Sequence, residues 1–137
     1  MTRVINWPDV LAAEIEAARV QAYVLGTHDC LRFTCRCIEA MTGVDYWPRF
    51  EGYTTRREAL RTIARIAPTL AGAVDIVLGQ VMRPAPFAHR GDVVLFHDAA
   101  GDHLGVCVGL KAAVLGEAGL AFVRLDHPGV VGCWRVE

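Results

Sequence analysis

The segment Arg83-Pro84-Ala85-Pro86 separates two halves of the chain that differ in hydrophobic periodicity. Before it, apolar residues recur at spacings of three and four, as on one face of a helix. After it come short, β-branched runs separated by turn residues, which are typical of an antiparallel sheet. The spaced prolines favour a stiff, extended connector between the halves. This order predicts an α+β fold, with N-terminal helices packed on a C-terminal antiparallel sheet.

Residues that start or stop helices bound the expected elements. Gly26 ends an apolar pattern that begins near Pro8, and Thr27 or Asp29 can cap a second helix through about residue 41, which Gly43 ends. Two further helices are expected, from a capping box at 55–58 to before Pro68 and over 70–78. Strands are expected at 93–96, 104–110, 112–115, 120–125 and 130–136, with hairpin loops at 98–102 and 116–119.

Length and charge narrow the class of protein. The 137 residues are expected to form a single domain, 1–137, with a core that needs no disulfides. Fourteen basic and fifteen acidic residues give a net charge of −1, which argues against nucleic acid as the main partner. No apolar run is long enough to span a membrane, and the N-terminus lacks a signal-peptide pattern, so synthesis in a cytosol is expected. Five cysteines in a reducing compartment are expected to remain free thiols.

Two residues far apart in the sequence are candidates for a catalytic pair. Cys30 follows a glycine turn and begins a helical pattern, where unpaired backbone N–H groups favour a thiolate. His103 follows a polar loop and begins an apolar strand, where it could act as a base. A cysteine and a histidine that meet in the fold are typical of thiol hydrolases. The alternative for each residue taken alone is structural: a buried cysteine and a solvated turn histidine.

A zinc site is an alternative use of the cysteines and histidines near Cys30. His28, Cys30, Cys35 and Cys37 have unlike spacings, and the chain contains no Cys-x-x-Cys pair, so no metal ligand set is predicted. His28 could assist Cys30, cap the helix or face solvent. Surface or turn positions are expected for the remaining histidines, His89, His97 and His127. No cofactor is expected.

Short motifs along nearly the whole chain resemble those of the NlpC/P60 cysteine peptidases. The run from Tyr23 to Gly26, followed by Asp29-Cys30, is similar to their Tyr-x-Trp-Gly … Asp-Cys signature. Their Gly-Asp strand and His-x-Gly strand resemble segments 90–96 and 103–109. The order and spacing of the motifs most resemble small NlpC/P60-like proteins encoded in phage and prophage tail gene clusters. Further shared positions are Thr42-Gly43, Tyr53, Thr55 and Trp134 to Val136.

The resemblance implies a papain-like fold and assigns roles to its residues. Cys30 would be the nucleophile, His103 the general base, and Tyr23 would lie near the sulfur. Asp29 and Leu25 would contribute to substrate binding, and backbone N–H groups beside Cys30 would form the oxyanion hole. The implied substrates are amide bonds of bacterial peptidoglycan peptides. The implied setting is a protein made in the bacterial cytoplasm and assembled into a phage tail or tail-like particle, with other tail proteins as partners.

Two departures from the family pattern keep other functions open. Leu25 replaces the signature tryptophan, and Val114 and Leu115 stand where a polar residue usually orients the histidine. Asp126 or Glu117 could take over that role from a neighbouring loop. A catalytically weak or inactive module for tail assembly, or an acyltransferase, therefore remains an alternative to the peptidase.

If Cys30 and His103 act as a catalytic pair, we expect two structural features. The Cys30 sulfur should lie within about 4 Å of a His103 ring nitrogen and be open to solvent. Its pKa should lie well below that of a free cysteine.

Overall fold

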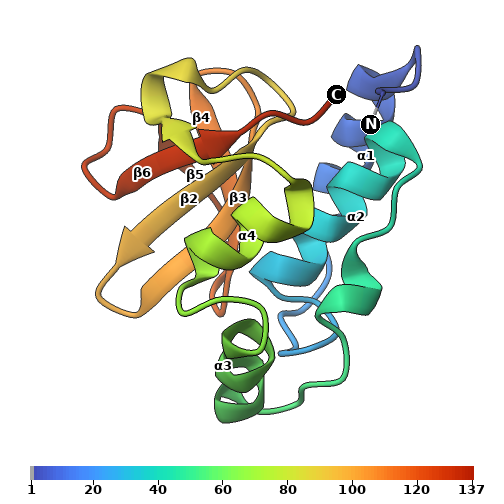
Figure 1. Ribbon diagram of the computed structural model, residues 1–137. Coiled ribbons are helices and arrows are strands. Elements are labelled where there is room, and N and C mark those ends of the chain that lie inside the picture. The colour runs from blue at the N-terminus through green and yellow to red at the C-terminus, as the bar shows by residue number, and fades with distance from the viewer. Residues whose placement is uncertain (1) are drawn as a thin grey trace.

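The computed structural model describes residues 2–137, which form a group of helices beside an antiparallel sheet (Figure 1). The α-helices are α1 (Trp7–Arg19), α2 (Cys30–Thr42), α3 (Arg56–Ala64) and α4 (Leu70–Leu78), with short 3₁₀ helices η1 (Trp47–Arg49) and η2 (Ala85–Phe87). The strands are β1 (Arg83–Pro84), β2 (Val93–Asp98), β3 (Gly101–Cys107), β4 (Lys111–Gly116), β5 (Gly119–Arg124) and β6 (Val130–Trp134). The predicted α+β class is confirmed.

The sheet has the strand order β1-β6-β2-β3-β4-β5, and each neighbouring pair is antiparallel. The β2–β3 hairpin closes where Asp98 pairs with Gly101, and the β4–β5 hairpin closes where Gly116 pairs with Gly119. Both tight turns lie inside the predicted loops. The β3–β4 ladder begins only at Gly105, so the first half of β3 has an edge that β4 does not cover.

Local capping signals placed most helix ends correctly. The Asp29 carboxylate accepts the Arg32 N–H at 2.8 Å at the start of α2, and Gly43 ends that helix with φ of 79°. Thr55 caps α3 and also bonds to the Glu58 side chain.

The end of α1 differs from the prediction. The helix ends at Arg19, whereas the apolar spacing predicted that it would continue to Gly26. Residues 20–25 instead lead into a turn closed by paired hydrogen bonds between Val24 and His28. Three β-branched or aromatic side chains in this stretch, Val20, Tyr23 and Val24, weaken its helix propensity.

The main core lies between the helices and one face of the sheet (Figure 1). Alternate residues of the strands point into it, which is the period-two pattern of a sheet with one buried face. Its fully buried members include Leu11, Phe33, Met41, Val106, Leu115 and Trp134. A smaller apolar cluster, built around Val94, Cys107 and Val114, lies on the opposite face.

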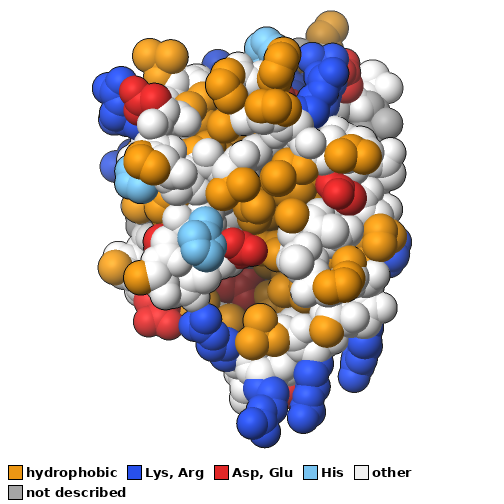
Figure 2. Space-filling model, turned by 60° about the vertical axis from the view of Figure 1, so that its left-hand side comes forward, with side chains coloured by type: hydrophobic (Ala, Val, Ile, Leu, Met, Phe, Trp, Pro, Cys, Tyr) orange, Lys and Arg blue, Asp and Glu red, His pale blue; other side chains and the backbone are white. Residues whose placement is uncertain are grey.

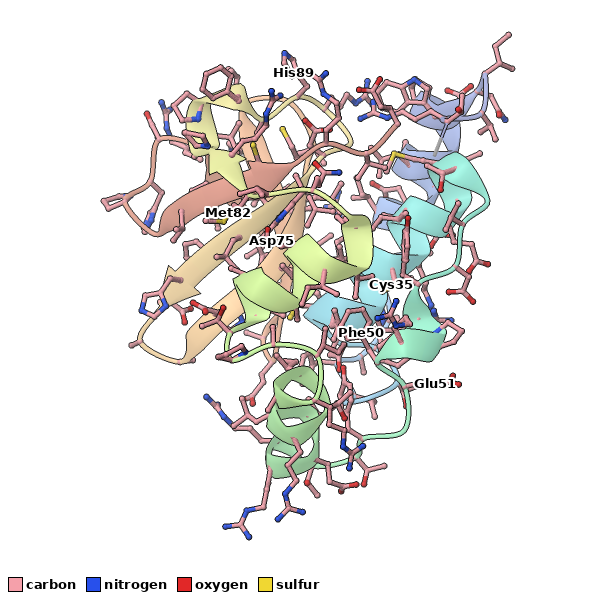
Figure 3. The ribbon with its side chains drawn as sticks, viewed as in Figure 1. Cys35, Phe50, Glu51, Asp75, Met82 and His89 are labelled. Atoms are coloured by element: carbon pink, nitrogen blue, oxygen red, sulfur yellow. The ribbon has the colours of Figure 1, made fainter. Side chains whose placement is uncertain are left out.

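Two acidic side chains join segments that are distant in the sequence. Buried Asp92 accepts a hydrogen bond from Arg3 at 3.1 Å and so ties the N-terminal segment to the sheet. Asp75 of α4 accepts the Trp134 indole N–H at 2.8 Å and the Met82 N–H at 2.9 Å, and Figure 3 shows Asp75 and Met82 near each other where α4 faces the sheet. Among residues 2–137, no helix combines the length and the hydrophobicity that a membrane span requires.

Candidate active site

A cavity of about 430 Å³ lies between the start of α2, the helices α3 and α4, and the β2–β3 hairpin. Cys30 and His103, which are 73 positions apart, both line it. One wall is apolar and includes Leu60, Ile63 and Leu70. Figure 2 shows this hollow below a broad group of hydrophobic side chains. The volume lies within the range of small-molecule and substrate sites.

Cys30 is the first residue of α2, and its side chain reaches the cavity because of the turn that precedes it. Gly26 adopts φ of +82° in that turn, and a Cβ there would lie 2.0 Å from the Tyr53 carbonyl oxygen. Only glycine fits this position. The tight turn therefore positions the helix start, and with it the thiol, against the segment that contains Tyr53.

The surroundings of the thiol favour its protonated form. Burial raises the pKa of Cys30 to about 11, and the nearby Asp29 carboxylate acts in the same direction. Backbone N–H groups of Leu104 and Leu31 oppose the rise, since they hydrogen-bond the sulfur. This is opposite to the predicted lowering of the pKa. The free protein therefore holds a neutral thiol at pH 7, and a base must remove its proton during attack.

The His103 ring is held by a hydrogen bond to a carboxylate. Its Nε2 lies 2.8 Å from Oδ1 of Asp98, which sits at the end of β2 across the two-residue turn. This hydrogen bond lowers the pKa of Asp98, so the carboxylate is ionised and can only accept. Nε2 therefore carries the hydrogen of this bond, and in the neutral form of the ring the lone pair lies on Nδ1. The ring also rests beside Phe96, with centroids 6.2 Å apart.

The carboxylate that contacts the His103 ring is thus that of Asp98 and not that of Asp126, the residue suggested from the sequence. Asp126 does not line the cavity, and its carboxylate accepts two hydrogen bonds from Arg124 instead. Glu117, the other suggested substitute, does line the cavity, from the β4–β5 turn. The sequence predicted that the residue bonded to His103 would follow it in the chain. Asp98 instead precedes His103 by five residues, at the other end of the hairpin turn.

The remaining predicted site residues lie at the cavity but differ in what they can do. Tyr23 and Leu25 line it directly. Burial and the Asp29 charge raise the pKa of Tyr23 to about 12, so its hydroxyl stays a proton donor. Asp29 also lines the cavity, yet it is only 2% exposed. Its carboxylate accepts the Gly26 N–H at 2.8 Å and the Tyr53 hydroxyl at 2.5 Å, besides capping α2. The contacts of Asp29 are those of a positioning residue and not of a substrate ligand.

Tyr53 and Arg56 are cavity residues to which sequence reasoning gave no role in the site. Burial and the bond to Asp29 raise the pKa of Tyr53, which fixes it as the donor in that hydrogen bond. Arg56 donates to the Ala100 carbonyl at 2.7 Å and so joins α3 to the hairpin that carries His103. Neither residue type at these positions is distinctive in sequence, because both roles depend on long-range contacts.

The other histidines and cysteines do not form a metal site. His28 is 1% exposed, and its ring lies between the Ala18 carbonyl and the Arg36 side chain, so it does not assist Cys30 or face solvent. Cys35 and Cys37 are buried free thiols in α2, and Figure 3 places Cys35 near Phe50. Among residues 2–137, no group of three or more His, Cys, Asp or Glu side chains is arranged to hold a metal ion.

Together these residues bring a thiol, a histidine bonded to a carboxylate, and the start of a helix to one cavity. Backbone N–H groups of Cys30 and Leu31, at the start of α2, lie beside the thiol. This set can perform acyl transfer through a thioester.

Comparison with known proteins places the chain in a family and leaves its activity open. No curated protein matches the sequence. A family model described as Domain of unknown function (DUF6950) matches residues 2–136, which is nearly the full length. The chain therefore belongs to the DUF6950 family.

Proposed function

We propose that this protein is a thiol hydrolase in which Cys30 is the nucleophile, His103 the general base and Asp98 the group that orients the histidine. The observation that supports this most strongly is that the Asp98 carboxylate hydrogen-bonds Nε2 of His103 in the same cavity that Cys30 lines. A solvated turn histidine would need neither the ordered ring nor the shared cavity.

The reaction follows from these positions. Nδ1 of His103 takes the thiol proton while the Cys30 sulfur attacks the amide carbonyl carbon, and the resulting oxyanion is stabilised by N–H groups at the start of α2. The imidazolium then gives its proton to the leaving amine as the C–N bond breaks, which leaves a thioester. Water attacks the thioester while His103 accepts its proton. The C–S bond then breaks to release the acid, and the imidazolium returns that proton to the sulfur.

The proposed substrates are amide bonds of bacterial peptidoglycan peptides, and the proposed setting is a phage tail or tail-like particle. The motifs around Cys30 and His103 support this proposal, because they resemble those of NlpC/P60 peptidases. The chain order also supports it, because helices precede an antiparallel sheet, as in a papain-like fold. The charged side chains at the cavity, which include Arg56, Asp102 and Glu117, suit peptides that carry both carboxylates and amines.

A second candidate function is a tail-assembly module that has lost most of its catalytic activity. One observation favours it: burial raises the pKa of Cys30 to about 11, whereas a strongly activated thiol has a lowered one. In that case the same fold would act through contacts with other tail proteins.

Digestion of purified muropeptides distinguishes the hydrolase from the tail-assembly module. Wild-type protein should release new amino groups, Cys30→Ala should not, and Cys133→Ala, which removes a buried thiol of the sheet, should retain activity. If wild type and Cys30→Ala behave alike while both bind tail proteins, the assembly function replaces the hydrolase.

A further inference from the structure

The first half of β3 has an uncovered edge that lies beside the thiol. The β3–β4 ladder begins at Gly105, whereas Leu115 and Gly116 of β4 pair with β5. The start of α2 reaches this edge, because the backbone N–H of Leu104 hydrogen-bonds the Cys30 sulfur. Backbone groups on an uncovered strand edge can pair with a further chain segment.

The direction of the backbone groups along β3 follows from its ladder. In an antiparallel sheet each residue directs its N–H and C=O to one neighbouring strand, and the next residue directs them to the other. Cys107 bonds through both groups to Gly91 and Asp92, on the β2 side. Counting back in steps of two, the odd-numbered residues of β3 bond to β2. Leu104 and Asp102 therefore direct their backbone groups away from β2, which agrees with the bond from Leu104 to the sulfur.

Asp102 thus presents an unpaired N–H and an unpaired C=O on the cavity side of β3. Within residues 2–137, no side chain, loop backbone or β4 residue hydrogen-bonds either group. Asp102 lines the cavity, and its carboxylate is engaged separately, 2.7 Å from Nδ1 of His97. One donor beside one acceptor matches the backbone of a single peptide residue. An anion offers acceptors only and an acyl chain offers neither, so this edge selects a peptide backbone.

This unpaired donor and acceptor lie within reach of the thiol. Asp102 and Leu104 are two residues apart on β3, which corresponds to about 7 Å along the strand. The Cys30 sulfur lies against the Leu104 N–H. An extended peptide with one residue paired to Asp102 therefore has an amide beside the sulfur, one or two residues further along.

The side chain of the paired peptide residue would meet an apolar wall. Opposed residues on neighbouring strands place their side chains on the same face of the sheet. Leu104 belongs to the main core on the helix side, and Asp102, two residues away, shares that face. The part of the cavity wall formed by α3 and α4 includes Leu60, Ile63 and Leu70. An aliphatic side chain suits this position.

We propose that the protein binds an extended peptide as an added strand on the edge of β3, with an aliphatic residue paired to Asp102. The Asp102 N–H donates to a carbonyl of the peptide, and a peptide N–H donates to the Asp102 carbonyl. The inference rests on the proposed function in one respect, that the bound peptide is the substrate whose next amide Cys30 attacks. Substrate recognition then depends on the peptide backbone, which non-peptide amides lack.

Alkylation of Cys30 by peptide reagents tests this pairing without requiring turnover. The probes are acetyl-Ala-Leu-Ala chloromethyl ketone and chloroacetyl-Ala-Leu-Ala amide, which extend from the reactive carbon in the two chain directions. Peptide mapping by mass spectrometry gives the rate at Cys30. Each rate is divided by that of the matching small reagent, chloroacetone or chloroacetamide, and we call this ratio the peptide advantage. Wild type should show a peptide advantage of about 10-fold or more in one series, since two hydrogen bonds are gained.

Removing one partner of the pairing at a time should reduce the peptide advantage. Replacing a backbone N–H of the probe by an ester oxygen should lower it about 5-fold at one position. Glutamate in place of the probe's leucine should lower it by about the same factor, because a charge would be buried against the apolar wall. Asp102→Pro removes the N–H at a position where proline leaves the β2 ladder intact, and should lower the advantage. Asp102→Ala is the matched control, since it loses the carboxylate and keeps the N–H.

The outcomes that overturn the proposal are distinct from those that overturn the hydrolase. Strand pairing is wrong if neither series shows a peptide advantage, if ester probes match amide probes at every position, or if glutamate matches leucine. It is also wrong if Asp102→Pro and Asp102→Ala, both folded by circular dichroism, show equal advantages; the ester probes decide if the proline variant does not fold. A peptide advantage without muropeptide cleavage supports the binding site and rejects the hydrolase, whereas cleavage without an advantage rejects strand pairing alone.

Discussion

Asp98 accepts the Nε2–H of His103 at 2.8 Å across the turn that joins β2 to β3. The two residues are five positions apart, so the orienting group and the base belong to one hairpin. A second pair on the same hairpin, His97 with Asp102 at 2.7 Å, does not include a candidate base and offers a built-in control.

Removing the Asp98 carboxylate should slow turnover. Asp98→Ala leaves the ring without its acceptor and should reduce kcat by about 100-fold, whereas Asp98→Asn, whose amide oxygen still accepts, should lose less. His97→Ala breaks the other hairpin pair and should leave kcat within about twofold. Equal loss in Asp98→Ala and His97→Ala would show that the effect comes from hairpin stability and not from orientation of His103.

Alkylation of Cys30 should depend steeply on pH. Burial raises the pKa of Cys30 to about 11, so the reactive thiolate is about one part in ten thousand at pH 7. The rate with iodoacetamide should rise about tenfold for each pH unit from 7 to 10, after subtraction of the rate for Cys30→Ala. A plateau that is already reached near pH 7 would instead reveal a preformed thiolate.

Gly26→Ala should destabilise the protein far more than Gly43→Ala. Both glycines have positive φ, +82° and +79°, but only the Cβ at position 26 meets another atom, the Tyr53 carbonyl oxygen. We expect a loss of about 1 kcal/mol in the free energy of unfolding for Gly43→Ala and of more than about 3 kcal/mol for Gly26→Ala. Urea denaturation measures both, and similar losses would contradict the close approach.

Asp29 should matter for stability because its carboxylate joins three segments. Asp29→Ala removes the cap of α2 and leaves the Gly26 N–H and the Tyr53 hydroxyl without their acceptor, which should lower the free energy of unfolding by about 3 kcal/mol. Tyr53→Phe removes one of these bonds and should lose about 1 kcal/mol. If the two variants unfold at the same urea concentration, the cap and the Gly26 bond contribute nothing measurable.

Much of the fold could be predicted because its signals are local. Asp29, Thr55 and Gly43 mark helix ends through hydrogen bonds within a few residues, or through a backbone angle that glycine tolerates. The change from helical spacing to alternation after Arg83 placed the sheet, since each period follows from the geometry of one element. The prediction that Cys30 begins a helix is confirmed, since α2 starts there. The prediction that His103 begins a strand was wrong, since β3 starts at Gly101 and His103 is its third residue.

Tertiary structure decided what those local signals do not contain. The pKa of Cys30 depends on the atoms packed around it, so a helix start that favours a thiolate became a site that raises the pKa. His28 is buried because α1 ends early and supplies its carbonyl partner, Ala18. Asp98 rather than Asp126 contacts His103 because the β2–β3 register pairs His103 with Phe96, which places Asp98, two residues further along β2, diagonally across on the same face. The sequence by itself determined the elements and the reactive residue types; burial and register, which exist only between elements, decided their protonation states and partners.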